Sequence, residues 1–129
     1  MIVADASAVV EVLLNTPSGL EIRRYLAAEE TIHVPHLLDL QVLQVLRRYA
    51  RISTANSPRV EEALQDYASM QLNRHGHLAL LPRIWELRHN WTAYDAAYIA
   101  LAEALDAPLI TRDRALASRS GHRARVLVI

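Results

Sequence analysis

Short apolar runs alternate with longer segments of helical spacing along this chain of 129 residues. The apolar runs predict strands over residues 2–4, 31–34, 109–111 and 124–129. Apolar residues at intervals of three and four predict helices over residues 6–14, 20–28, 36–51, 57–71, 82–89, 92–105 and 114–118. Residues 73–80 predict a turn followed by a further short strand. This alternation predicts one α/β domain over residues 1–129, with three α/β/α layers around a mainly parallel sheet.

The predicted helix over residues 92–105, TAYDAAYIALAEAL, is rich in Ala and Leu and carries one acid, Asp95, in its first turn. Thr92 is suited to cap this helix, because its hydroxyl can accept a hydrogen bond from a free backbone N–H of the first turn. The apolar composition of the remainder predicts a buried helix. Asp95 therefore either serves the start of its own helix or faces a site that it shares with other acids.

Two further acids directly follow predicted strands: Asp5 after residues 2–4 and Asp113 after residues 109–111. Sites in open parallel sheets collect beyond the carboxyl ends of the strands, and Asp95 on the same edge completes a cluster of three. Converging carboxylates repel unless a cation lies between them, and an all-oxygen set suits Mg²⁺ or Mn²⁺. Such an ion supports nuclease or phosphatase chemistry. Capping explains each acid separately, since Asp is a leading N-cap residue.

The composition narrows the classes of protein and of chemistry. Hydrophobic residues make up 52% and charged residues 22% of the chain, which predicts an ordered core, and no apolar run has the length of a membrane helix. Nothing at the start resembles a signal peptide, so we expect a cytoplasmic protein. The chain has no Cys, which excludes thiolate sites. All 14 basic residues are Arg, so there is no Lys for a Walker-A loop or for Schiff-base chemistry. A net charge of zero argues against binding nucleic acid by bulk charge alone.

Three polar side chains away from the acids need an explanation. Gln41 lies one turn from Leu37 and Val45 on an apolar surface of the helix over residues 36–51. An unpaired polar group there costs about 1–3 kcal/mol, so we expect a partner. His75 and His77 have the spacing of two ligands on one face of a strand, but no third ligand accompanies them, so a surface turn is the favoured explanation.

Residues next to two of the acids have two interpretations each. Arg112 and Arg114 flank Asp113, and they either contact a phosphate of a ligand or are ordinary solvent-exposed residues at the start of a helix. Ser7 and Thr111 either hold water beside a metal or are ordinary cap and turn residues.

Three segments together resemble a PIN domain, and among PIN domains the VapC-type toxins of bacterial toxin–antitoxin pairs. They are VADASAVVEVLL near the start, PHLLDLQVLQVLRR in the middle and TAYDAAYIALAEALDAPLITRD near the end. The resemblance implies an endoribonuclease that depends on Mg²⁺ or Mn²⁺ and cuts cellular RNA. It also implies a homodimer and a small cognate antitoxin of the VapB type. The acids of the family fall on Asp5, Asp95 and Asp113, and its neighbouring hydroxyls fall on Ser7 and Thr111.

One position departs from the family pattern, because Gln41 stands where the family usually has Glu. Gln removes one negative charge and cannot act as a base, but it can still accept a hydrogen bond from water beside the metal. Asp39 is no replacement, since two residues along a helix amount to about 200° of rotation. The departure leaves open an enzyme of reduced activity and a catalytically impaired module that binds antitoxin or RNA without cutting.

Two further expectations concern alternatives. A phosphatase or receiver domain also carries an Asp after its first strand, but it usually needs a Lys that this chain lacks. The Val and Leu surfaces of the predicted helices over residues 36–51 and 57–71 exceed what one helix face buries, which predicts a homodimer or else a thicker core.

Overall fold

The computed structural model describes residues 1–129 and contains one five-stranded sheet of order β3-β2-β1-β4-β5. All four pairs of neighbouring strands are parallel. The strands are β1 (Ile2–Ala4), β2 (Ile32–Pro35), β3 (Leu72–His75), β4 (Leu109–Thr111) and β5 (Val126–Val128). The helices are α1 (Ala6–Leu13), α2 (Pro17–Ala27), α3 (Leu37–Ile52), α4 (Ser57–Ser69), α5 (Leu81–Glu86), α6 (Ala93–Leu105) and α7 (Arg114–Ser118), with 3₁₀ turns η1 (Thr54–Asn56) and η2 (Leu78–Leu80). The predicted α/β class is confirmed.

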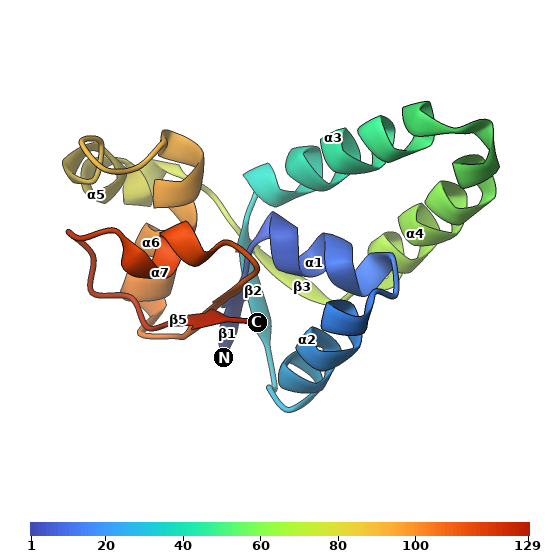
Figure 1. The fold of residues 1–129 in the computed structure, drawn as a ribbon. Helices are drawn as coiled ribbons and strands as arrows, with labels where there is room; N and C mark the ends of the chain where they lie inside the picture. Colours follow the sequence, from blue (N-terminus) through green and yellow to red (C-terminus); the bar gives the residue numbers. More distant parts are fainter.

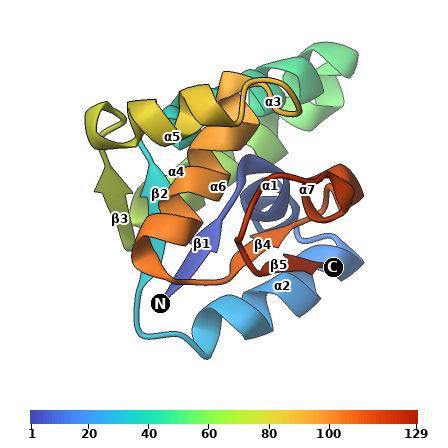
Figure 2. The ribbon, with the colours of Figure 1, turned by 90° about the vertical axis from the view of Figure 1, so that its left-hand side faces the viewer.

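Helices cover both faces of the sheet. Figure 1 shows α1 to α4 on one side of the central strands and α5 and α6 on the other, and Figure 2 shows α6 crossing in front of the sheet. All seven residues from 96 to 102 of α6 are 2% exposed or less, so the predicted buried helix is confirmed. No helix in the chain is both long enough and apolar enough to cross a membrane.

Four helix starts meet at the carboxyl edge of the sheet. The helices α1, α3 and α7 begin within two or three residues of the ends of β1, β2 and β4. Helix α6 runs in the opposite direction, because its last residue is followed within four residues by the first residue of β4. The first turn of α6 therefore lies at the same edge, which brings Asp95 to the end of the sheet where Asp5 and Asp113 are.

Two local predictions were wrong. Residues 73–80 do not form a turn followed by a strand: β3 comes first, because residues 72–75 pair with residues 32–35 of β2, and η2 follows. Because β3 lies at the edge of the sheet, it can contain polar residues such as Asn73 and Arg74. Its sequence therefore lacks the alternation of apolar and polar residues that marks a strand. The second helix begins at Pro17, not at residue 20, because the hydroxyl of Thr16 accepts the backbone N–H of Gly19 at 2.9 Å and caps it.

Candidate active site

Asp5 is the most buried acid at the carboxyl edge, at 6% exposed. Its Oδ1 accepts hydrogen bonds from the hydroxyl of Ser7 at 2.7 Å and from the backbone N–H of Ala8 at 2.9 Å. Its Oδ2 accepts the hydroxyl of Thr111 at 2.5 Å. The bond from Ala8 makes Asp5 the N-cap of α1, so capping and a role in a site coincide in this residue.

The two hydroxyls are oriented by the chain that leaves β4. The backbone N–H of Arg112 donates to Ser7 Oγ at 2.9 Å, and the backbone N–H of Asp113 donates to Thr111 Oγ1 at 2.9 Å. Since each hydroxyl accepts one of these bonds, its single proton is free for Asp5. The predicted place of Ser7 and Thr111 beside the acids is thus found, and both side chains fix the carboxylate of Asp5.

Burial raises the pKa of Asp5, and the charge of Asp95 raises it further, while the hydrogen bonds from Thr111, Ser7 and Ala8 lower it. The pKa of Asp95 is also raised, first by burial and then by the charge of Asp113. The charge of Arg119 and a hydrogen bond to Thr92 act in the opposite direction. Asp95 therefore lies within electrostatic range of both other acids.

Asp95 and Asp113 differ in their local roles. Thr92, not Asp95, is the N-cap of α6, since its hydroxyl accepts the backbone N–H of Asp95 at 3.2 Å, as the sequence predicted. Asp113 is exposed and caps α7 by accepting the backbone N–H of Ala115 at 2.9 Å. The carboxylate of Asp95 is therefore the one that has no capping role.

The acids line the edge without closing around one point, since no three His, Asp or Glu side chains stand close enough to enclose a metal ion. Their chemistry nevertheless fits a hard divalent cation, because every donor is oxygen. A carboxylate has about four lone-pair positions, and three of those on Asp5 take hydrogen bonds, which leaves one for a cation. A cation here would also relieve the repulsion that raises the pKa of Asp5 and Asp95.

Gln41 has the hydrogen-bond partner that we expected from its position on the apolar surface of α3. The phenol of Tyr98, which is 2% exposed, donates a hydrogen bond of 2.6 Å to Gln41 Oε1. Burial raises the pKa of Tyr98, and the charges of Asp5 and Asp95 contribute, so the pair borders on the acids. Sequence reasoning did not single out Tyr98, although its spacing of three residues from Asp95 places both on one side of α6.

The arginines are arranged differently from the prediction. The guanidinium of Arg112 donates to the backbone carbonyl of Ile129, so its charge is directed to the end of the chain. Arg114 is exposed at the start of α7. Arg119, which no sequence signal marked, is the arginine whose charge acts on Asp95, and it lies 5.5 Å from the centre of the Trp91 ring.

The two histidines weighed as ligands have structural partners. His75 Nε2 lies 2.8 Å from His33 Nδ1 across β3 and β2, and His77 Nε2 accepts the backbone N–H of Leu37 at 3.2 Å. These contacts fasten the edge strand β3 and the start of α3.

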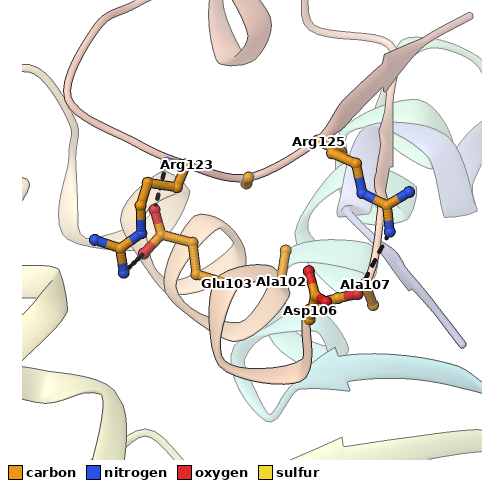
Figure 3. A pocket seen from close by; sticks show the side chains of 7 residues that line it. Ala102, Glu103, Asp106, Ala107, Arg123 and Arg125 are labelled. Carbon is orange, nitrogen blue, oxygen red and sulfur yellow. Dashed lines mark hydrogen bonds and ion pairs between the residues drawn. The ribbon is translucent and has the colours of Figure 1, made fainter.

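A hollow of about 270 Å³ lies at the other end of α6 (Figure 3). Glu103 is its central charge: it accepts the guanidinium of Arg83 at 2.7 Å and the backbone N–H of Arg123 at 2.7 Å. Arg125 donates to the carbonyl of Asp106 at 3.4 Å. These bonds tie the segment before β5 to α6, so we regard this hollow as structural, away from the acids.

Comparison with known proteins agrees with this fold. The model of the PIN domain family matches residues 2–121. Ribonuclease VapC9 of Mycobacterium tuberculosis is 40% identical over 129 residues, which cover 100% of this chain and 98% of that protein. PAE2754 from Pyrobaculum aerophilum has a TM-score of 0.67 at 21% identity, over 97% of this chain and 81% of its own. A toxin–antitoxin complex from Klebsiella pneumoniae has a TM-score of 0.65 at 17% identity, over 99% of this chain and 97% of the chain compared.

Proposed function

The chain belongs to the PIN domain family and, within it, to the VapC ribonucleases, and from that premise we propose that it is a metal-dependent endoribonuclease toxin acting on cellular RNA in the cytoplasm. The observation that carries the proposal is that Asp5, Asp95 and Asp113 lie at one edge of the sheet. The charge of Asp95 raises the pKa of Asp5, and the charge of Asp113 raises the pKa of Asp95. Mg²⁺ is the proposed cofactor, with Mn²⁺ as its substitute.

The three acids would hold the cation, and their side chains differ in how firmly the surrounding structure fixes them. Asp5 is fixed by three hydrogen bonds, whereas Asp95 is half-buried and Asp113 is exposed. When bound, a divalent cation supplies an activated water and neutralises charge during displacement at phosphorus. Ser7 and Thr111 keep the carboxylate of Asp5 turned toward the site. Exposed Arg114 and the charge of Arg119 are placed to contact RNA phosphates, and Arg112 is not.

Incubation of the purified protein with total RNA in Mg²⁺, in Mn²⁺ and in EDTA tests this function. We expect discrete fragments with either metal and none in EDTA, and we expect Asp5→Ala to abolish them. Asp66→Asn, which changes an exposed acid on α4, is the matched control and should cut as the wild type does. Fragments that persist in EDTA would refute the metal mechanism.

With Gln41 in place of the Glu of the family pattern, the site has one negative charge fewer. We therefore propose that the protein binds its metal weakly and cuts at a reduced rate. Gln41→Glu should lower the Mg²⁺ concentration needed for half-maximal cleavage. The neutral amide of Gln41 and the open arrangement of the acids also favour a second candidate, a PIN module that binds antitoxin or RNA without cutting. That candidate predicts no cleavage in either metal.

We propose a VapB-type antitoxin as the protein partner. The Klebsiella pneumoniae chain of similar fold belongs to a toxin–antitoxin complex. A groove between α1, α2 and α4 is lined by Val12, Leu13, Met70, Arg23 and Asp66 and has a volume of about 280 Å³. Its mixture of apolar and charged side chains suits an amphipathic segment of a partner.

We also propose a homodimer, through a different surface from the one the sequence suggested. On α3 and α4 the residues Val42, Leu46 and Val60 are 8% exposed or less and belong to the core of one protomer, whereas Leu40, Leu43 and Ile52 of α3 are exposed but are spread along the helix. The α5 face, made of Leu78, Leu81, Trp85 and Tyr94, has exposures of 49% to 82%. Large exposed apolar side chains on neighbouring elements mark an interface, and we propose a second copy as the occupant.

A further inference from the structure

We infer that Tyr98 is a positioning residue that holds the side chain of Gln41 so that its amide nitrogen donates a hydrogen bond to a phosphate oxygen of the RNA. Position 41 then acts as a donor to the substrate, where a Glu would act as an acceptor toward the metal. This inference rests on the proposed function of the acidic edge, and it gives the departure from the family pattern a chemical role.

The first step concerns the proton of Tyr98. The phenol oxygen lies 2.6 Å from Gln41 Oε1. Since an amide oxygen can only accept, the phenol proton goes to Gln41. The two helices α6 and α3 are thereby joined through a pair whose donor and acceptor are both defined.

The second step concerns the amide of Gln41. An amide has an acceptor oxygen at one end and two N–H donors at the other, and it is planar. Because Tyr98 donates to Oε1 at 2.6 Å, the NH₂ group lies at the other end of the amide, away from the phenol. The amide nitrogen has no free lone pair with which to bind a metal ion.

The third step concerns what lies around the pair. Tyr98, which holds Gln41 at 2.6 Å, lies within range of the charges of both Asp5 and Asp95. RNA that reaches these acids brings phosphate oxygens to the same place, where the acids repel them. The N–H of Gln41 is uncharged, but it would donate to a negatively charged phosphate oxygen. A hydrogen bond to a charged acceptor is stronger than one between two neutral groups. A fourth carboxylate at position 41 would add to the repulsion.

Single-turnover cleavage of total RNA over a range of protein and Mg²⁺ concentrations separates the two roles of position 41. We expect Tyr98→Phe and Gln41→Ala each to raise the protein concentration for half-maximal rate by about five- to tenfold. The double variant should be no worse than either single one, because the two residues form one unit. Gln41→Glu should need less Mg²⁺ but more protein. Tyr67→Phe is the matched control, since it removes another buried phenol that donates at 2.5 Å, to Asp39.

A second measurement does not depend on cleavage. Binding of a fluorescently labelled single-stranded RNA of mixed sequence, with Ca²⁺ in place of Mg²⁺, is followed by anisotropy for the same variants. We expect weaker binding by Tyr98→Phe and Gln41→Glu and unchanged binding by Tyr67→Phe. If Gln41→Glu binds RNA as tightly as the wild type, or Tyr98→Phe has no effect on binding, the inference is wrong. A wild type that binds but does not cut would refute the proposed nuclease and leave this test intact.

Discussion

The hydroxyl of Thr111 donates a hydrogen bond of 2.5 Å to Oδ2 of Asp5, across 106 residues of the chain. The bond joins the ends of the neighbouring strands β4 and β1, and it is one of the bonds that oppose the effect of burial on the pKa of Asp5. The geometry of the acidic edge thus depends on a buried threonine as well as on the acids themselves.

Thr111→Val preserves the shape of this residue and removes its hydroxyl. We expect the free energy of unfolding to fall by about 1–3 kcal/mol, because a buried carboxylate oxygen loses its partner. The pKa of Asp5 should rise further, and the pH at which cleavage reaches half its maximum should rise with it. Denaturant unfolding and a pH–rate profile measure the two effects. Thr31→Val, which removes a hydroxyl beside His33 at the other end of the sheet, should leave the profile unchanged.

Asp95→Asn tests whether repulsion at the edge is relieved by metal. Without metal, the variant should have a higher melting temperature than the wild type, because the repulsion with Asp113 and Asp5 is removed. Saturating Mg²⁺ should stabilise the wild type by about 1–3 kcal/mol through binding to the folded state, and it should stabilise the variant far less. Calorimetry with and without Mg²⁺ measures both. An equal response to Mg²⁺ in the two proteins would show that Asp95 does not hold the ion.

Asp39 shows why an acid two residues from Gln41 has a different role, since it accepts a forked hydrogen bond from Arg74 at 2.9–3.1 Å and another from Tyr67. The bond from Arg74 lowers the pKa of Asp39 below its ordinary value of 3.8. The stability that this ion pair contributes is therefore present above pH 3.8 and is lost as the pH falls through the lowered pKa.

Asp39→Asn should lower the free energy of unfolding at pH 7 by about 0.5–1 kcal/mol, a small value because both partners are more than a third exposed. The difference from the wild type should shrink toward zero in acid. Urea unfolding at pH 7 and at pH 3 measures it. A difference that grows in acid would contradict the assignment of the ion pair.

The α5 face predicts how the protein associates. Trp85→Glu should convert a dimer to a monomer, because a charge would be buried at the centre of an apolar interface. Light scattering after size exclusion measures the mass. Ile52→Glu, which places the same charge on a more exposed apolar residue at the end of α3, should leave the dimer intact. If Ile52→Glu dissociates the dimer and Trp85→Glu does not, the interface lies on α3 as the sequence suggested.

The α/β class and the location of the three acids at one edge of the sheet could be predicted from the sequence, because both follow from local patterns. Strand ends and helix caps show in the spacing of apolar residues, so the spacing alone assigns Asp5, Asp95 and Asp113 to one edge of the sheet. The contact between Tyr98 and Gln41 could not be predicted, since it depends on how α3 and α6 pack across the end of the sheet. Only the mismatch of Gln41 with its apolar surroundings indicated that a partner existed.

Other details depend on tertiary context in the same way. The edge strand β3 has polar residues because one of its sides is unpaired, so no alternation marks it. Arg119 acts on Asp95 only because the segment after α7 folds back toward the start of α6, where it donates to the carbonyl of Asn90 at 3.2 Å. The direction of the Ser7 and Thr111 protons required the backbone N–H groups of Arg112 and Asp113 to be located.

Cleavage of total RNA as a function of Mg²⁺ concentration, for the wild type and for Asp5→Asn, Asp95→Asn and Asp113→Asn, tests the central claim most directly. The account predicts cleavage that saturates with Mg²⁺ in the wild type and a loss of at least about 100-fold in the rate for each variant, a loss of transition-state stabilisation of about 2.7 kcal/mol or more. Cleavage that survives all three substitutions, or that proceeds unchanged in EDTA, would contradict a metal-dependent site at this edge.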